Sequence, residues 1–250
     1  MLRNASRFFI FLFVLLVVTL AQQSVSSSAT LFSEDFSDNL AGWTFVGWPE
    51  GNEWQIGSAT ASSGQFIDFF PDPEFDHTPT GDNGVAGVVI GGNASITPHE
   101  FEYLVSPVID LGTTTGTTML EYYRWLNTDF TPFMNATVDI FNGTDWINLV
   151  PAPNGLDGII ADSSWTVQAF DLSSYVSSLF QLRYGLSVEI IPEQPQTLPL
   201  VGGSWNIDDI RIDGELAVPV PLPAALPLFA ASLGIAGFFG WRRKRAIIAA

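Results

Sequence analysis

The chain has 250 residues, and 9 Lys and Arg against 26 Asp and Glu give it a formal net charge of −17. All the acids lie between residues 34 and 215, where the only basic residues are Arg124, Arg183 and Arg211, so this part carries 3 − 26 = −23. Such a segment repels phosphate backbones, which excludes nucleic acid as a partner. The absence of cysteine excludes disulfides, thiolate metal sites and a cysteine nucleophile.

The N-terminus has the pattern of an export signal. Arg3 and Arg7 precede an unbroken apolar run over residues 8–18, and small residues follow at Thr19 and Ala21. This pattern predicts a secretory signal peptide over residues 1–21. The alternative is a retained N-terminal anchor, but the run is shorter than the roughly 20 residues that a membrane span needs.

A second apolar segment, residues 222–241, contains no charged residue. At about 1.5 Å per residue it would extend roughly 30 Å as a helix, one hydrocarbon thickness. The cluster that follows directly, Arg242, Arg243, Lys244 and Arg245, is expected to stay in the cytoplasm. These features predict a single C-terminal transmembrane helix, because four adjacent positive charges do not suit the alternative of a buried core helix.

A proline motif opens this apolar segment: Val220, Pro221, Leu222, Pro223 and Ala224. With the apolar helix and the basic cluster behind it, residues 217–250 resemble the PEP-CTERM sorting signal in its VPLPA form. The resemblance implies an exported protein of a Gram-negative bacterium that pauses in the inner membrane, is processed by exosortase, and reaches the cell surface or extracellular matrix. It also implies an association with exopolysaccharide and biofilm. A permanent membrane anchor is the alternative.

Residues 22–216 predict one all-β domain, a sandwich built from short strands separated by turn residues. Residues 180–188 alternate between apolar and polar or small side chains, which is typical of a strand with one buried face. Residues 136–140 and 146–150 flank Asn142-Gly143 and predict a hairpin. Further strands are expected at residues 84–90, 103–106, 117–125, 165–170 and 204–212.

Four stretches of this body also resemble a family. They are residues 32–36 with Gly42-Trp43, the Asp76-His77-Thr78 turn with Thr80-Gly81, residues 104–111, and residues 205–210. They are similar to MAM-type jelly rolls and to the bacterial choice-of-anchor J modules, and the lack of cysteine favours the bacterial version. The resemblance implies a jelly-roll sandwich that acts as an extracellular binding or adhesion unit.

Acidic residues open and close the predicted domain: Glu34, Asp35 and Asp38 near its start, and Asp208 and Asp209 near its end. Because the first and last strands of a jelly roll commonly pair, these acids are expected to meet, with Asp76 as a further ligand. Calcium takes six to eight oxygen ligands, so the pattern predicts a structural calcium site. The alternative is that the acids are solvated and bind nothing.

The parity of apolar residues changes within the last predicted strand. Trp205 and Ile207 share one face, whereas Ile210 and Ile212 have the opposite parity. The change falls at Asp208-Asp209 and predicts a β-bulge there.

Catalytic motifs are absent, so the body is expected to be a non-enzymatic surface or matrix protein. The alternative is a carbohydrate-active enzyme on the same scaffold, for which Glu121, on an aromatic strand, is the best candidate residue. His77 and His99 are expected to be structural or solvated. Most Trp residues are expected to fill the core, and Trp48 is the candidate for glycan contact.

Overall fold

The computed structural model describes residues 26–37, 42–47, 51–63, 70–129, 131, 133–150, 159–190, 203–217 and 232–234. These residues form twelve strands, and residues 232–234 are helical. Residues Ser28–Leu216 make up one compact unit. A second unit takes the two ends of the chain, of which only residues 26–27, 217 and 232–234 are described.

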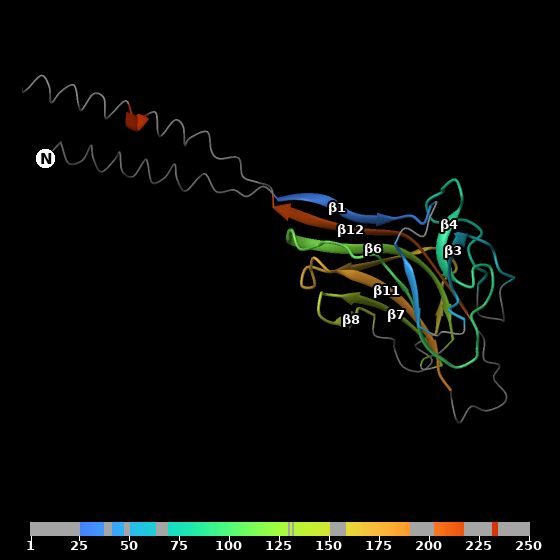
Figure 1. The fold of residues 1–250 in the computed structure, drawn as a ribbon. Helices are drawn as coiled ribbons and strands as arrows, with labels where there is room; N and C mark the ends of the chain where they lie inside the picture. The colour runs from blue at the N-terminus through green and yellow to red at the C-terminus, as the bar shows by residue number, and fades with distance from the viewer. Residues whose placement is uncertain are drawn as a thin grey trace, which may run out of the picture. The chain divides into compact units, whose positions relative to one another are not determined.

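One antiparallel sheet has seven strands and forms the upper layer in Figure 1: β1 (Ser26–Glu34), β3 (Trp54–Ser58), β4 (Gly84–Val88), β6 (Thr114–Thr128), β9 (Ile160–Ala161), β10 (Thr166–Asp171) and β12 (Ser204–Ala217). Its order is β10-β6-β12-β4-β3, and in addition β1 pairs with β12 and β9 with β6. The first and last strands therefore pair, as the sequence predicted.

The other sheet has five strands: β2 (Thr44–Gly47), β5 (His99–Val105), β7 (Met134–Phe141), β8 (Trp146–Asn148) and β11 (Gln181–Val188). Its order is β2-β5-β11-β7-β8, and every pair is antiparallel. The all-β, two-sheet prediction is confirmed.

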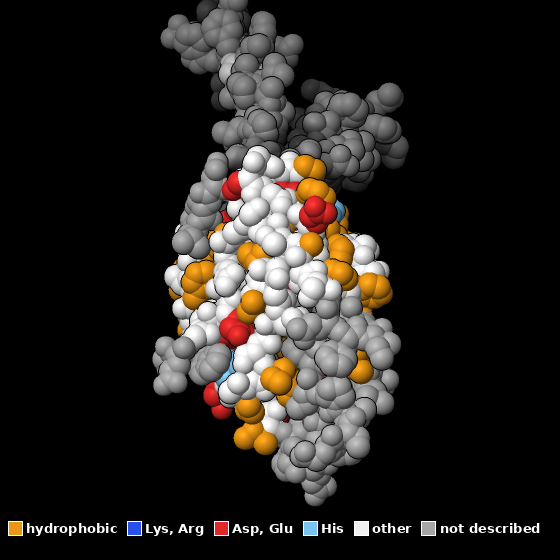
Figure 2. All heavy atoms as spheres, turned by 90° about the vertical axis from the view of Figure 1, so that its right-hand side faces the viewer, with side chains coloured by type: hydrophobic (Ala, Val, Ile, Leu, Met, Phe, Trp, Pro, Cys, Tyr) orange, Lys and Arg blue, Asp and Glu red, His pale blue; other side chains and the backbone are white. Residues whose placement is uncertain are grey.

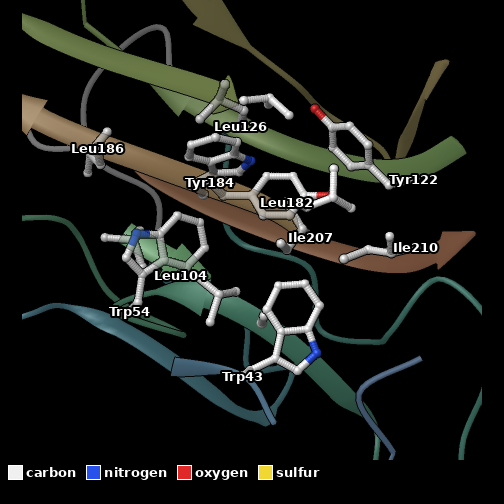
Figure 3. Close-up of a cluster of buried hydrophobic side chains, with 14 of the residues drawn as sticks. Trp43, Trp54, Leu104, Tyr122, Leu126, Leu182, Tyr184, Leu186, Ile207 and Ile210 are labelled. Atoms are coloured by element: carbon white, nitrogen blue, oxygen red, sulfur yellow. The ribbon is translucent and has the colours of Figure 1, made fainter. Parts of the chain in front are cut away.

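The core lies between the two sheets and follows the predicted alternation. Leu182, Tyr184 and Leu186 of β11 are buried, and they face Trp54 and Trp205 of the seven-stranded sheet. Figure 3 shows Tyr184 beside Trp54, and their ring centroids are 6.4 Å apart. Trp54 and Trp205 are themselves 5.2 Å apart. Aromatic packing of this kind buries large apolar areas at tilted geometries that suit the ring quadrupoles.

The predicted β-bulge is present in β12. Asp208 pairs with Tyr123 of β6 and Arg211 pairs with Glu121, so two residues of β12 lie opposite one residue of β6. Asp209, within the bulge, has a positive φ of 47°. The bulge restores an inward direction to Ile210 and Ile212, which are buried.

Several local predictions differ from the structure. None of the strands expected from the sequence covers residues 26–34, yet β1 lies there, because pairing with β12 satisfies its backbone whatever its side chains. The 142–145 connection is a four-residue loop, in which the Asn142 side chain accepts hydrogen bonds from Thr144 N and Asp145 N.

Candidate functional site

The structure brings three of the predicted ligands together. Asp208 lies at the bulge of β12, Asp209 follows it, and Asp76 lies in the loop before β4. Asp208 Oδ2 accepts a hydrogen bond from His77 N at 2.7 Å, which ties the loop to the strand. We call this group, with His77 and Thr80, the acidic turn.

Asp76 and Asp209 are each held by the turn residues. Asp76 Oδ2 accepts from Thr80 N at 2.7 Å and from Thr80 Oγ1 at 2.5 Å. Asp209 Oδ2 accepts from His77 Nδ1 and from Thr78 Oγ1, both at 2.6 Å. Within the Asp76-His77-Thr78 turn, Asp76 bonds Thr80, His77 bonds Asp209 and stacks on Tyr123, and Thr78 bonds Asp209.

Asp208 is the most buried acid of the turn, at 1% exposure. Burial, with the neighbouring Asp209 and Asp76, raises the pKa of its carboxyl to about 8, although hydrogen bonds from His77 N and Asp209 N lower it. The folded turn therefore brings three carboxyl groups close enough for Asp76 and Asp209 to disfavour ionisation of Asp208. A bound cation would relieve the repulsion between these carboxyl groups.

The acids at the start of the domain have local partners. Glu34 accepts from Phe36 N and from Trp43 Nε1, both at 2.9 Å. Asp35 is exposed and accepts from Ser37 N at 3.0 Å. Asp38 lies outside the described residues.

The segment that follows β1 nevertheless passes close to the acidic turn. A Cβ added at Gly84 would lie 2.4 Å from the Phe36 carbonyl oxygen, and Gly84 N donates to Thr80 Oγ1. The backbone at Phe36 therefore approaches the turn through Gly84.

The sequence did not identify Asp72, which is 3% exposed. It accepts hydrogen bonds from Ser204 Oγ and from Asn206 Nδ2, on the outward row of β12. Burial raises the pKa of Asp72 to about 6. The only signal in the sequence was two polar residues alternating with Trp205 and Ile207, which does not reveal that a loop covers them.

Aromatic side chains lie on the outer face of the seven-stranded sheet. His77 stacks on Tyr123 with centroids 3.3 Å apart, and Trp125 meets Trp165 edge to face at 5.8 Å. Glu121 lies two residues before Tyr123 on the same row and is exposed. The seven-stranded face therefore places Glu121 where the sequence expected it, on an exposed strand face.

A second aromatic group lies on the outer face of the five-stranded sheet, and sequence reasoning missed it. The Arg183 guanidinium lies 4.0 Å from the Tyr103 ring centroid and 4.2 Å from the Trp146 ring centroid. Arg183 Nε donates to Asp139 Oδ2 at 2.8 Å. We call Tyr103, Asp139, Trp146 and Arg183 the Arg183 platform.

Gly185 makes room for this platform. A Cβ there would lie 2.5 Å from Tyr103 Cε1, so the Tyr103 ring lies against the backbone of β11. The three platform side chains other than Asp139 are half-buried. Its residues lie on four different strands, β5, β7, β8 and β11, so no local pattern in the sequence could have joined them.

Figure 2 shows one end of the molecule. Red acidic and pale-blue His side chains appear there among the described residues, and no blue Lys or Arg side chain is seen on them. This agrees with the acidic composition of the body.

The remaining predicted residues fall outside the described part of the chain. These are Trp48, the proline motif Val220–Ala224, the basic cluster Arg242–Arg245 and residues 1–21. Among the residues that the structure does describe, no helix is long and apolar enough to cross a membrane.

Fold and surface together define the class: an acidic all-β sandwich with an aromatic outer surface on each sheet. No family model and no curated protein sequence matches the chain. Solved structures do match. The K3 cleaved adhesin domain of Lys-gingipain from Porphyromonas gingivalis W83 is 15% identical, covers 75% of this chain and 99% of its own, and has a TM-score of 0.40.

Two carbohydrate-related structures also match. The CBM22-1 xylan-binding domain of Paenibacillus barcinonensis Xyn10C is 12% identical, with coverage of 78% and 99% and a TM-score of 0.40. SGBP-B from a xyloglucan utilization locus in Bacteroides uniformis is 14% identical, with coverage of 71% and 48% and a TM-score of 0.38. At such identities and TM-scores, neither a ligand nor a residue role transfers to this chain.

Proposed function

We propose that the body is a non-enzymatic polysaccharide-binding domain and that the Arg183 platform is its binding surface. The carrying observation is the guanidinium held between the Tyr103 and Trp146 rings. Ring faces stack on the apolar faces of sugars, while a guanidinium and a carboxylate supply donors and acceptors for hydroxyl groups. The ion pair with Asp139 fixes Arg183 in advance, which lowers the ordering cost of binding.

The charge of the body selects among glycans. Residues 34–215 carry −23, so a polyanionic glycan would be repelled at most of the surface. We therefore propose a neutral exopolysaccharide as the ligand.

Affinity electrophoresis tests the proposal. The full chain, purified in detergent, is run in gels containing neutral or acidic polysaccharides. Retardation is expected in at least one neutral glycan, and Tyr103→Ala or Trp146→Ala should weaken it at least tenfold. Trp125→Ala, on the other sheet, is the matched control and should retain binding. If Trp125→Ala instead loses glycan binding while Tyr103→Ala and Trp146→Ala keep it, the binding site lies on the seven-stranded face.

The competing function is glycan cleavage. Glu121 is exposed on the same strand as Tyr123 and Trp125. A glycan bound to these rings would therefore lie near its carboxyl group, so glycan cleavage is the second candidate function. Released reducing ends that disappear in Glu121→Gln would establish an enzyme and overturn the binding proposal.

We further propose a jelly-roll sandwich that is exported, held in the inner membrane by residues 222–241 and released at the cell surface after exosortase processing. The pairing of β1 with β12 and the repeated crossing of the chain between sheets support the jelly roll. The signal peptide, proline motif and basic cluster support export and processing.

The acidic turn is proposed to bind structural calcium. Support comes from the convergence of Asp76, Asp208 and Asp209, and from the raised pKa of Asp208. Calcium added in excess of a chelator is expected to raise the melting temperature, since a ligand of the folded state stabilises it. Asp209→Asn should lose part of that increment and Asp82→Asn should keep it. An unchanged midpoint at millimolar calcium would show that the acids are only solvated.

A further inference from the structure

One acidic side chain points into the sandwich itself. On β5, Glu102 has the same parity as the buried Leu104, and it is 0% exposed. A carboxylate between two sheets is costly unless it is paired or coordinates a metal. Burial, with a smaller contribution from the nearby Glu53 carboxylate, raises the pKa of Glu102 to about 7, although the hydrogen bond from Glu53 N lowers it.

A bulge in β5 brings His99 to the side of Glu102. His99 pairs with Val188 and Glu102 pairs with Leu186. The chain therefore advances three residues along β5 over a stretch where it advances only two along β11. Residues three apart on a regular strand face opposite sides. The extra residue reverses that parity, so His99 and Glu102 lie on one side, and His99 is 8% exposed.

Glu53, immediately before β3, completes the group. One ligand atom from each of Glu53, His99 and Glu102 lies within 4.8 Å of the other two. Glu53 N donates to Glu102 Oε2 at 2.8 Å, while Glu102 Oε1 is buried and accepts no hydrogen bond. The cluster therefore holds a fully buried, unpartnered carboxylate oxygen.

Backbone groups around the ligands already orient them. Both oxygens of Glu53 accept from Ser95 N, at 3.1 and 2.9 Å. His99 Nδ1 lies 2.8 Å from the Glu100 carbonyl, which can only accept, so Nδ1 carries the hydrogen. The lone pair of the neutral ring is then on Nε2, the arrangement that metal-binding histidines commonly use.

We propose that Glu53, His99 and Glu102 form a binding site for a divalent first-row transition metal, with zinc as the ion that fits the donors. One imidazole nitrogen and two carboxylate oxygens are zinc ligands, and a fourth position would take water. Two carboxylates and a neutral imidazole also balance a charge of +2. Calcium fits poorly, because it prefers six to eight oxygens.

The site would join the two sheets. Glu53 leads into β3 of the seven-stranded sheet, whereas His99 and Glu102 belong to β5 of the five-stranded sheet. Trp54 Nε1 already donates to the Glu102 carbonyl at 3.3 Å across the same gap. A metal there would therefore stabilise the sandwich without taking part in glycan binding.

The test is zinc binding by the untagged full chain in detergent after treatment with a chelator. Equilibrium dialysis should give one zinc ion per chain, and zinc at 100-fold over Kd should raise the melting temperature by about 5–10 °C. Cobalt in place of zinc should give the visible absorption of a four-coordinate site.

Glu102→Gln and His99→Gln should each weaken zinc binding at least tenfold, whereas the exposed neighbour variant Glu100→Gln should bind as the parent does. Glu102→Gln keeps the shape of the side chain, so its metal-free melting temperature should not fall. Asp208→Asn should leave zinc binding intact, which separates this site from the acidic turn. No bound zinc, or equal binding in all the variants, would overturn the proposal and leave Glu102 as a protonated core acid.

Discussion

Asp208 shows at the scale of one residue how burial couples the acidic turn to pH. The pKa of its carboxyl is about 8 in the folded protein, against 3.8 ordinarily. Between these values the folded state holds a proton that the unfolded state has lost, so stability falls as pH rises. One such carboxyl lowers the free energy of unfolding by about 1.4 kcal/mol for each pH unit between its unfolded pKa of 3.8 and its folded pKa of about 8.

In chelator, the free energy of unfolding is therefore expected to decrease from pH 5 to pH 8. Asp208→Asn cannot ionise, so its pH slope should be smaller. Denaturant titrations at four pH values measure this. Asp145→Asn, in the exposed loop after β7, should keep the parental slope, and an unchanged slope in Asp208→Asn would contradict the account of the turn.

Single residues also show what the sequence can and cannot predict. Trp205 was expected in the core because it shares parity with Ile207, and it is 1% exposed. Glu102 and His99 were not grouped, because the strand was expected to begin at Tyr103 and only pairing with β11 reveals the bulge. Parity can be read from a sequence, whereas a change of register depends on the partner strand.

At the scale of elements, the packing of the segment after β1 against the start of β4 depends on Gly84. A side chain there would collide with the Phe36 backbone at 2.4 Å, and backbone cannot move as a flexible side chain can. Gly84→Ala is expected to destabilise the protein by about 1–3 kcal/mol. It should also weaken the calcium increment, since Gly84 N bonds Thr80 of the acidic turn.

Gly81→Ala is the matched control, because no atom lies within 4 Å of the added Cβ. It is expected to be neutral or slightly stabilising through the entropy of the unfolded chain. Chemical denaturation of both variants measures the difference. Equal stabilities would contradict the close approach of the Phe36 backbone to Gly84.

The strands differ in how well their sequences predict them. β11 was clear because Leu182, Tyr184 and Leu186 alternate with smaller or polar residues and are buried. β1 was missed at its Ser-rich start, because its strand state comes from pairing with β12, 170 or more residues away, rather than from side-chain pattern. The Arg183 platform was missed for the same reason, since it joins four strands.

At the scale of the whole molecule, processing at the proline motif makes a distinct prediction. In the proposed sorting signal, Pro221 and Pro223 are expected to disfavour helix and to keep the segment extended at the membrane face. Replacing both with Ala should leave membrane insertion intact and block release, because insertion depends on residues 222–241 and the basic cluster. Mass spectrometry of the surface fraction should find no chain carrying Arg242–Arg245. Released chains that still carry this cluster would establish a permanent or unprocessed C-terminus.

The central claim is that the body binds a neutral polysaccharide through Tyr103, Arg183 and Trp146 and does not cleave it. Size-exclusion chromatography with light scattering, on the full chain mixed with a neutral glycan that retards it in gels, measures both properties in one sample. The account predicts a complex that carries polysaccharide of undiminished molar mass and that is lost in Trp146→Ala. Polysaccharide that shortens with time, or a complex that persists unchanged in Trp146→Ala, would contradict it.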